Sequence, residues 1–336
     1  MESQIPGQGL QQVEGLWFES DTIVLRADQS VFRVSKSLLA ARSSVFRDMT
    51  TFPSPSSSEV EMFQGAPVVN LSDATSDVEP FLRAIFDSSY FMPPPAPIPF
   101  LSVLGILRLA HKYDVNYLFK RALLHLEAVY PSSPPKLLAD LHSNPLGYGA
   151  NMISFDLIAL PILEQVGAVW LLPFALYSLG TYSVEEAMAA PEWTALPDSL
   201  KQRSLPLPMK QLRMIVRLHH RCINFAPECS DAVSCAEELQ GFLQWSLFEN
   251  SPLVGDEFTA DPLALWQDGS GLHLWKDLIE RSLCGVCRGR VQAQYGDAWG
   301  RLWAELPGNC RMECWATLLA ERKRVLDPES ENCPSG

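Results

Sequence analysis

The stretch that decides the fold of the first part of the chain spans residues 36–49 and reads KSLLAARSSVFRDM. Ser35 precedes it, and a serine hydroxyl can accept a hydrogen bond from a free amide in the first turn of a helix. Ser43 and Ser44 precede Val45–Met49 and can cap a second helix in the same way. The pattern therefore predicts two short helices in succession, the first over Lys36–Arg42.

Short strands are predicted on both sides of these helices. Apolar and β-branched residues alternate over Asp21–Arg26 and again over Val31–Val34, and the residues between them, 27–30 (ADQS), are typical of a turn. Pro67–Leu71 is a third run of this kind. All the strand-like runs lie before or at Leu71, so we expect the sheet in the first part of the chain.

Helical spacing of apolar residues follows these strands. It extends over residues 78–86, 103–111 and 115–126, and the proline-rich segment Pro93–Pro99 separates the first helix from the second as a stiff connector. The pattern predicts one ordered domain over residues 16–130. The polar residues 1–15, rich in Gly and Gln, are expected to form a disordered leader.

This order of elements, and the residues themselves, resemble a BTB/POZ domain. Residues 36–49 are similar to the family's most recognisable run, and residues 21–25 (DTIVL) with 32–34 (FRV) resemble its opening hairpin. Residues 69–73 (VNLSD) resemble the family's next strand and its turn. Residues 81–87 (FLRAIFD) and 106–115 (ILRLAHKYDV) resemble its later helices. The resemblance implies an α+β domain in which helices flank a short mixed sheet.

The resemblance also implies protein partners. BTB domains form homodimers or hetero-complexes through the first hairpin and helix, and part of the family docks a cullin scaffold of a ubiquitin ligase. The segment after Met49, residues 50–64, contains no motif that we can assign to cullin binding. We therefore expect a protein-interaction module, with homodimerisation favoured over the cullin role.

Three apolar residues, Leu16, Trp17 and Phe18, precede the predicted hairpin. The strand pattern offers no core position for three large side chains in a row, and exposed apolar patches often mark interaction surfaces. We therefore predict that a partner chain covers these three residues.

The pattern from Lys136 to Leu326 is helical, with proline and glycine interruptions, which predicts an all-α second domain followed by a flexible tail over 327–336. Residues 170–177 (WLLPFALY) and 303–307 (WAELP) resemble the helical tail of the large fungal, basidiomycete-like set of BTB proteins. Large rings at helical spacing are typical of a core. The tryptophans concerned are Trp170, Trp193, Trp245, Trp266, Trp275, Trp299, Trp303 and Trp315.

One apolar stretch, residues 157–180, has the length of a membrane span. It contains Glu164, Pro161 and Pro173, and a carboxylate is costly in the middle of a bilayer. The sequence favours a pair of buried helices that is broken near Pro173.

Charge and motifs narrow the function classes. The net charge of -13 and the lack of a basic run oppose binding to nucleic acid, which depends on Lys and Arg. The first residues lack the pattern of a secretory signal, so a cytoplasmic or nuclear location is expected. No nucleotide-binding, hydrolase or zinc-protease motif occurs, and we expect no enzyme activity. The alternative is a helical-domain enzyme or small-molecule binder that uses the BTB domain only for assembly.

The cysteines give the one site signal. Cys284 and Cys287 have the C-x2-C spacing of a metal-ligand pair, and Cys229 and Cys235 form a looser pair with five residues between them. Four thiolates could hold a structural zinc ion, whereas isolated buried thiols would be ordinary packing residues. The pattern therefore leaves both readings open. The other four cysteines are then spare: Cys222, Cys310, Cys314 and Cys333.

Overall fold

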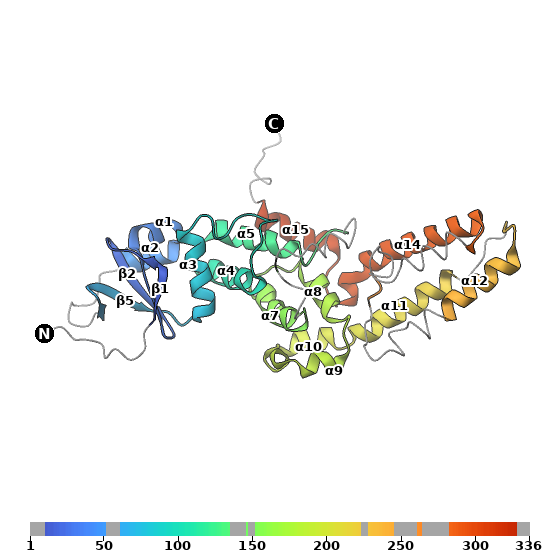
Figure 1. Ribbon diagram of the computed structural model, residues 1–336, viewed down its shortest axis with the longest axis horizontal. Helices are drawn as coiled ribbons and strands as arrows, with labels where there is room; N and C mark the ends of the chain where they lie inside the picture. Colours follow the sequence, from blue (N-terminus) through green and yellow to red (C-terminus); the bar gives the residue numbers. More distant parts are fainter. Residues whose placement is uncertain are drawn as a thin grey trace, which may run out of the picture. The chain divides into compact units, whose positions relative to one another are not determined.

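The computed structural model describes residues 11–51, 61–134, 146, 152–222, 228–244, 261–263 and 282–327. The chain divides into two compact units (Figure 1). The first contains Met1–Leu126 with Pro145–Gly147, and the second contains Glu127–Asn144 with Tyr148–Gly336. The described strands all lie in the first unit, whereas the described part of the second unit is helical, which confirms the predicted fold class.

The first unit is built on a short mixed sheet. Its strands are β1 (Gln11–Trp17), β2 (Thr22–Ala27), β3 (Ser30–Ser35), β4 (Met62–Phe63) and β5 (Ala66–Asn70). Their order across the sheet is β1-β3-β2-β5-β4. Strands β2 and β3 form the predicted antiparallel hairpin, and β1 and β5 run parallel to β3 and β2 respectively. Strand β1 is therefore one edge of the sheet.

Strand β1 corrects the predicted leader, because ordered structure extends back to Gln11 instead of beginning near Leu16. The strand has few apolar residues, and its buried positions, Val13 and Leu16, are three residues apart instead of alternating. The pairing of β1 with β3 shifts register between Gln12 and Trp17, and Gly15 adopts a φ of 81° within this irregularity. A bulged strand does not follow the period of two, which is why the pattern missed it.

Helix α1 (Lys36–Arg42) begins as predicted, since the Ser35 hydroxyl accepts a hydrogen bond of 3.4 Å from the Leu38 amide. Helix α2 (Ser44–Thr51) follows, and the buried Ser43 hydroxyl accepts from the Phe46 amide at 3.1 Å. The same hydroxyl donates to the Tyr113 carbonyl at 2.6 Å. Residues 36–49 are thereby joined to the residue that ends the helix over Phe100–Lys112, 70 residues further along the chain.

Helices α3 (Thr75–Phe86), α4 (Phe100–Lys112) and α5 (Asn116–Glu127) complete the first unit as the spacing predicted. Helices α3 and α4 pack closely against each other. A Cβ on Gly105 of α4 would lie 2.9 Å from an Asp77 carboxylate oxygen, so only glycine allows this approach. Arg108 pairs with the same carboxylate and fixes the crossing of the two helices.

The second unit consists of helices in its described part. They are α7 (Met152–Gln165), α8 (Leu172–Leu179), α9 (Val184–Ala189), the 3-10 helix η2 (Pro191–Ala195), α10 (Asp198–Ser204), α11 (Leu207–Cys222), α12 (Ala232–Gln244), α14 (Gly285–Asn309) and α15 (Trp315–Leu326). Residues 157–180 form a helix pair, as predicted, but the break precedes Pro173, which lies in the first turn of α8, where its missing amide costs no hydrogen bond. No helix in the described ranges is long and apolar enough to span a bilayer.

Tryptophans contribute to the core of the second unit. Trp170 is fully buried, and its indole donates to Glu127 at 3.0 Å, while the Arg322 guanidinium forms two hydrogen bonds to the same carboxylate. Trp303 is buried between the rings of Trp299 and Trp315. The predicted core role is confirmed for Trp170, Trp193 and Trp303, whereas Trp299 and Trp315 are partly exposed. Trp245, Trp266 and Trp275 lie outside the described residues.

Candidate metal centre and interaction surface

The two cysteine pairs lie at the N-terminal ends of two helices. Cys229 precedes α12 and Cys235 lies in its first turn, while Cys284 is the N-cap of α14 and Cys287 lies in its first turn. The segments are 49 residues apart between Cys235 and Cys284. The fold therefore brings together two pairs that the sequence separates.

The four sulfur atoms form a compact cluster. All four Sγ atoms lie within 4.8 Å of one another, and the Sγ atoms of Cys229 and Cys284 are 3.7 Å apart. Zinc bonds of about 2.3 Å in tetrahedral geometry place the sulfurs about 3.8 Å apart. The observed positions thus require contractions of at most about 1 Å to coordinate one metal ion. The four cysteines are thus close enough to bind a metal ion, which is one of the two readings that the sequence left open.

Backbone amides point at these sulfurs. The Cys284 amide donates to the Cys235 sulfur at 3.4 Å, and the Cys287 amide donates to the Cys284 sulfur at 3.5 Å. A zinc ion with four thiolates carries a net charge of about -2. The positive ends of two helix dipoles and these amide donors favour such a charge. The site is therefore electrostatically suited to an anionic metal-thiolate centre.

The thiol pKa values differ among Cys229, Cys235 and Cys284. The Cys287 amide, followed by smaller effects, lowers the pKa of Cys284 to about 6. Desolvation raises the pKa of Cys229 and of Cys235. Ligand thiols must lose their protons to bind zinc, and a metal ion supplies the charge that favours this loss. Cys284 is thus more ready than Cys229 or Cys235 to begin coordination at neutral pH.

The spare cysteines have other surroundings. Cys310 is buried and its thiol donates to the Pro173 carbonyl at 3.6 Å, so it packs in the core. Cys314 is exposed at the start of α15 and contacts Thr317. The side chain of Cys222 and the whole of Cys333 lie outside the described residues.

The predicted interface residues do not share one environment. Leu16 is 1% exposed, because it packs in the core of its own unit, and the expectation that a partner covers it is wrong. Trp17 and Phe18 are only half-buried. Trp17 lies edge-on to Phe63 and Phe18 packs on Phe86. Both aromatic side chains remain candidates for a partner contact beside the edge strand β1.

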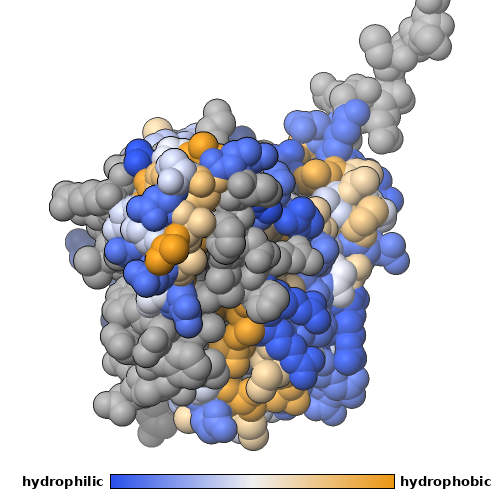
Figure 2. Space-filling model, turned by 90° about the vertical axis from the view of Figure 1, so that its right-hand side faces the viewer, coloured by the Kyte–Doolittle hydropathy of each residue, from blue (hydrophilic) through white to orange (hydrophobic). Residues whose placement is uncertain are grey.

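Other apolar side chains are exposed in each unit. In the first unit they are Val45, Met62, Met92, Leu101, Tyr117 and Leu124. In the second unit they are Met188, Leu205, Met209, Val216, Val233, Val286 and Leu319. On the face drawn in Figure 2, hydrophobic residues lie among hydrophilic ones. Exposed apolar side chains thus occur in both units, without a continuous patch that these residues define.

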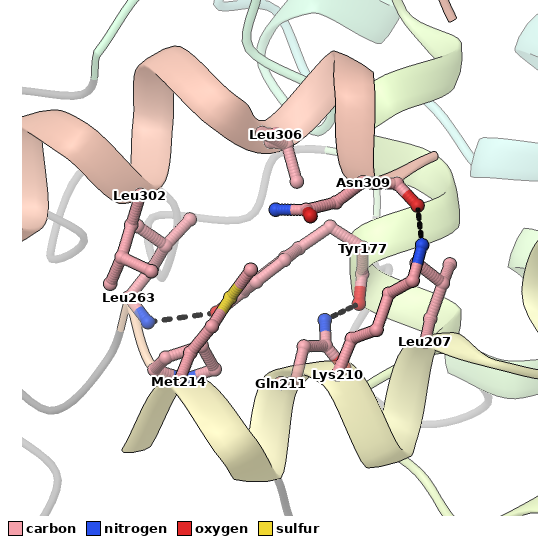
Figure 3. Close-up of a pocket in the computed structure, with 10 residues that line it drawn as sticks. Tyr177, Leu207, Lys210, Gln211, Met214, Leu263, Leu302, Leu306 and Asn309 are labelled. Carbon is pink, nitrogen blue, oxygen red and sulfur yellow. Dashed lines mark hydrogen bonds between the residues drawn. The ribbon is translucent and has the colours of Figure 1, made fainter. Parts of the chain in front are cut away.

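A cavity beside Tyr177 in the second unit bears on the alternative that the helical region is an enzyme or binds a small molecule. Tyr177, Gln211 and Leu263 are among its lining residues, and the Tyr177 hydroxyl accepts from the Leu263 amide at 2.8 Å (Figure 3). The Gln211 side chain donates to the Tyr177 carbonyl at 2.8 Å (Figure 3). The cavity has a volume of about 10 Å³. A space of this size holds at most one water molecule, so this cavity offers no room for a substrate.

Comparison with known protein families identifies the first unit. Residues 11–128 match the model of the BTB/POZ domain. The chain therefore contains a BTB/POZ domain, a protein-interaction module, followed by a helical region. No curated protein and no solved structure matched the chain.

Proposed function

We propose that the chain is an adaptor that self-associates through its BTB/POZ domain and uses its helical region to hold other proteins. The observation that carries the proposal is the BTB domain itself, with two half-buried aromatic residues, Trp17 and Phe18, at the end of β1, which is an edge of the sheet among the described strands. An edge strand has unpaired backbone groups that a second chain can bond. The location that fits this role is the cytoplasm or the nucleus.

The adaptor is proposed to present the partner that its helical region holds to a cullin-type ubiquitin ligase, whose scaffold would dock on the BTB domain. The support is the BTB domain, part of whose family docks such scaffolds. The helical region, with residues 170–177 and 303–307, also supports membership of the fungal BTB set. No feature of the described pocket favours the enzyme alternative, because the cavity beside Tyr177 is too small.

Affinity capture of the tagged full-length chain tests the adaptor role. We expect an untagged second copy of the chain and a cullin scaffold to be enriched at least ten-fold over a tag-only control. The double variant Trp17→Ala/Phe18→Ala should lose the second copy. Capture of neither protein from cells that express both at normal levels would contradict the adaptor proposal.

We also propose that Cys229, Cys235, Cys284 and Cys287 hold one structural zinc ion. The support is the clustering of the four sulfurs within 4.8 Å of one another at two helix N-termini. The ion would join the start of α12 to the start of α14. Its bonds to the four thiolates would contribute to the stability of the helical region.

Metal analysis of the purified chain tests the zinc proposal. Protein purified from zinc-supplemented cells is expected to contain one equivalent of zinc. Cys287→Ser should reduce this content below one tenth, because three thiolates leave the tetrahedral set incomplete. Cys314→Ser, which changes an exposed cysteine outside the cluster, should keep the full equivalent. Less than half an equivalent in the unaltered protein would overturn the proposal.

A further inference from the structure

We propose that Cys229 and Cys284 form a redox modification site, at which a hydroperoxide converts the metal-free thiols into a disulfide. The inference deepens the zinc proposal, since it concerns the same four thiols. Its geometry, however, needs only the cysteine cluster. The disulfide and the metal ion are alternatives at one site.

Accessibility singles out this pair, and its two sulfur atoms are also close together. The two sulfur atoms are 3.7 Å apart, and a disulfide bond of about 2.05 Å requires an approach of about 1.7 Å. Cys229 and Cys284 are both half-exposed, whereas Cys235 and Cys287 are each 1% exposed. A small oxidant therefore reaches the first pair directly, and the second pair is shielded.

The backbone also favours this pair. Cys229 precedes α12 and Cys284 is the N-cap of α14, so neither residue lies inside a helix. Cys235 and Cys287 lie within the first turns of these helices, where backbone hydrogen bonds fix them. The required approach of the two sulfurs can thus occur by adjustment of two helix ends, with both helices intact.

The oxidation proceeds in two balanced steps. The Cys284 thiolate attacks the peroxide, the O–O bond breaks, and the products are a sulfenic acid and one alcohol or water molecule after protonation. The Cys229 thiolate then attacks the sulfenyl sulfur, the S–O bond breaks, and a second oxygen leaves as water. The two thiolates lose two electrons in total, and these reduce the peroxide.

The consequence for the metal follows from ligand number. A disulfide between Cys229 and Cys284 leaves only the two buried thiols as ligands, and two thiolates do not complete the tetrahedral set of a structural zinc site. Oxidation would therefore release zinc, and bound zinc would protect the pair from oxidation. The helical region would then respond to peroxide through its link between α12 and α14.

Disulfide mapping on the full-length chain tests the inference. The chain is freed of metal by a chelator and of reductant by gel filtration, treated with one equivalent of hydrogen peroxide, and alkylated. Cleavage before Asp231 places Cys229 and Cys235 on different peptides, and trypsin releases Cys284 and Cys287 together on residues 282–288 (SLCGVCR). Fragmentation between Gly285 and Val286 then distinguishes these two cysteines.

We expect the Cys229–Cys284 disulfide to exceed each other pairing at least ten-fold. Cys229→Ser should abolish this product, and Cys314→Ser should leave its yield unchanged. A dominant Cys284–Cys287 or Cys235–Cys287 bond, or oxidation mainly at Cys314, would overturn the inference.

The second part of the experiment compares disulfide formation in the chain with and without bound zinc. With one equivalent of zinc, the disulfide should form at least ten-fold more slowly, and a chromogenic chelator should detect one zinc ion released for each disulfide. A protein that binds no zinc but forms the Cys229–Cys284 bond would support the redox site and overturn only the zinc proposal. Equal rates with and without bound zinc would contradict the protection that is inferred here.

Discussion

Removal of zinc is expected to lower the melting temperature of the helical region by about 8–16 °C. A ligand present at about 1,000 times its dissociation constant stabilises a folded protein by about 4.1 kcal/mol. For a unit of about 200 residues, each kcal/mol shifts the melting temperature by about 2–4 °C. The ion should act on this region because the four thiols join the starts of α12 and α14.

Differential scanning calorimetry with micromolar free zinc, and again with a chelator, measures this shift. Substitution of a buried cysteine changes stability for packing reasons as well, so the zinc-dependent difference is the quantity to compare. It should vanish in Cys287→Ser and persist in Cys314→Ser, whose exposed side chain lies outside the cluster. A zinc-dependent shift that survives in Cys287→Ser would place the metal elsewhere.

Truncation of two aromatic side chains should weaken self-association about 100-fold. Aromatic residues at the centre of an interface often contribute about 2 kcal/mol or more each, but such contributions are not additive. A loss of about 2.7 kcal/mol for the pair corresponds to a factor of about 100 in the dissociation constant. Trp17 and Phe18 are half-buried at the C-terminal end of the edge strand β1. The double variant Trp17→Ala/Phe18→Ala removes both rings at once.

The dissociation constants are measured by sedimentation equilibrium of the full-length chains, well below each melting temperature. This condition matters because Trp17 also packs on Phe63 of its own chain. Met92→Ala serves as the matched control, since Met92 is 49% exposed and lies outside β1. A double variant that associates as tightly as the control would remove these residues from the interface.

Local sequence signals predicted much of the first unit. Ser35 caps α1 through its hydroxyl, and the hairpin of β2 and β3 follows the alternation of apolar residues. Strand β1 was missed because its register shift breaks that alternation. The fate of Leu16 could not be predicted for the same reason, since its core position exists only once β1 pairs with β3.

The metal site and the packing of the second unit depend on contacts between residues far apart in the sequence, which the sequence does not specify. The C-x2-C spacing of Cys284 and Cys287 identified one half of the metal site, but no spacing rule specifies that Cys229 and Cys235 meet them. Cys284 as an N-cap was also missed, because helix starts are sought at Ser, Thr, Asp and Asn. The pairing of Glu127 with Arg322, 195 residues away, likewise depends on the packed helices.

Sedimentation equilibrium of the unaltered full-length chain measures its mass in solution and thereby tests self-association through the BTB domain. At micromolar concentration we expect a species of twice the chain mass of 37.4 kDa, which dissociates on dilution. The double variant Trp17→Ala/Phe18→Ala should sediment as a monomer at the same concentration. A single species of 37.4 kDa at every concentration of the unaltered chain would show that the chain does not self-associate.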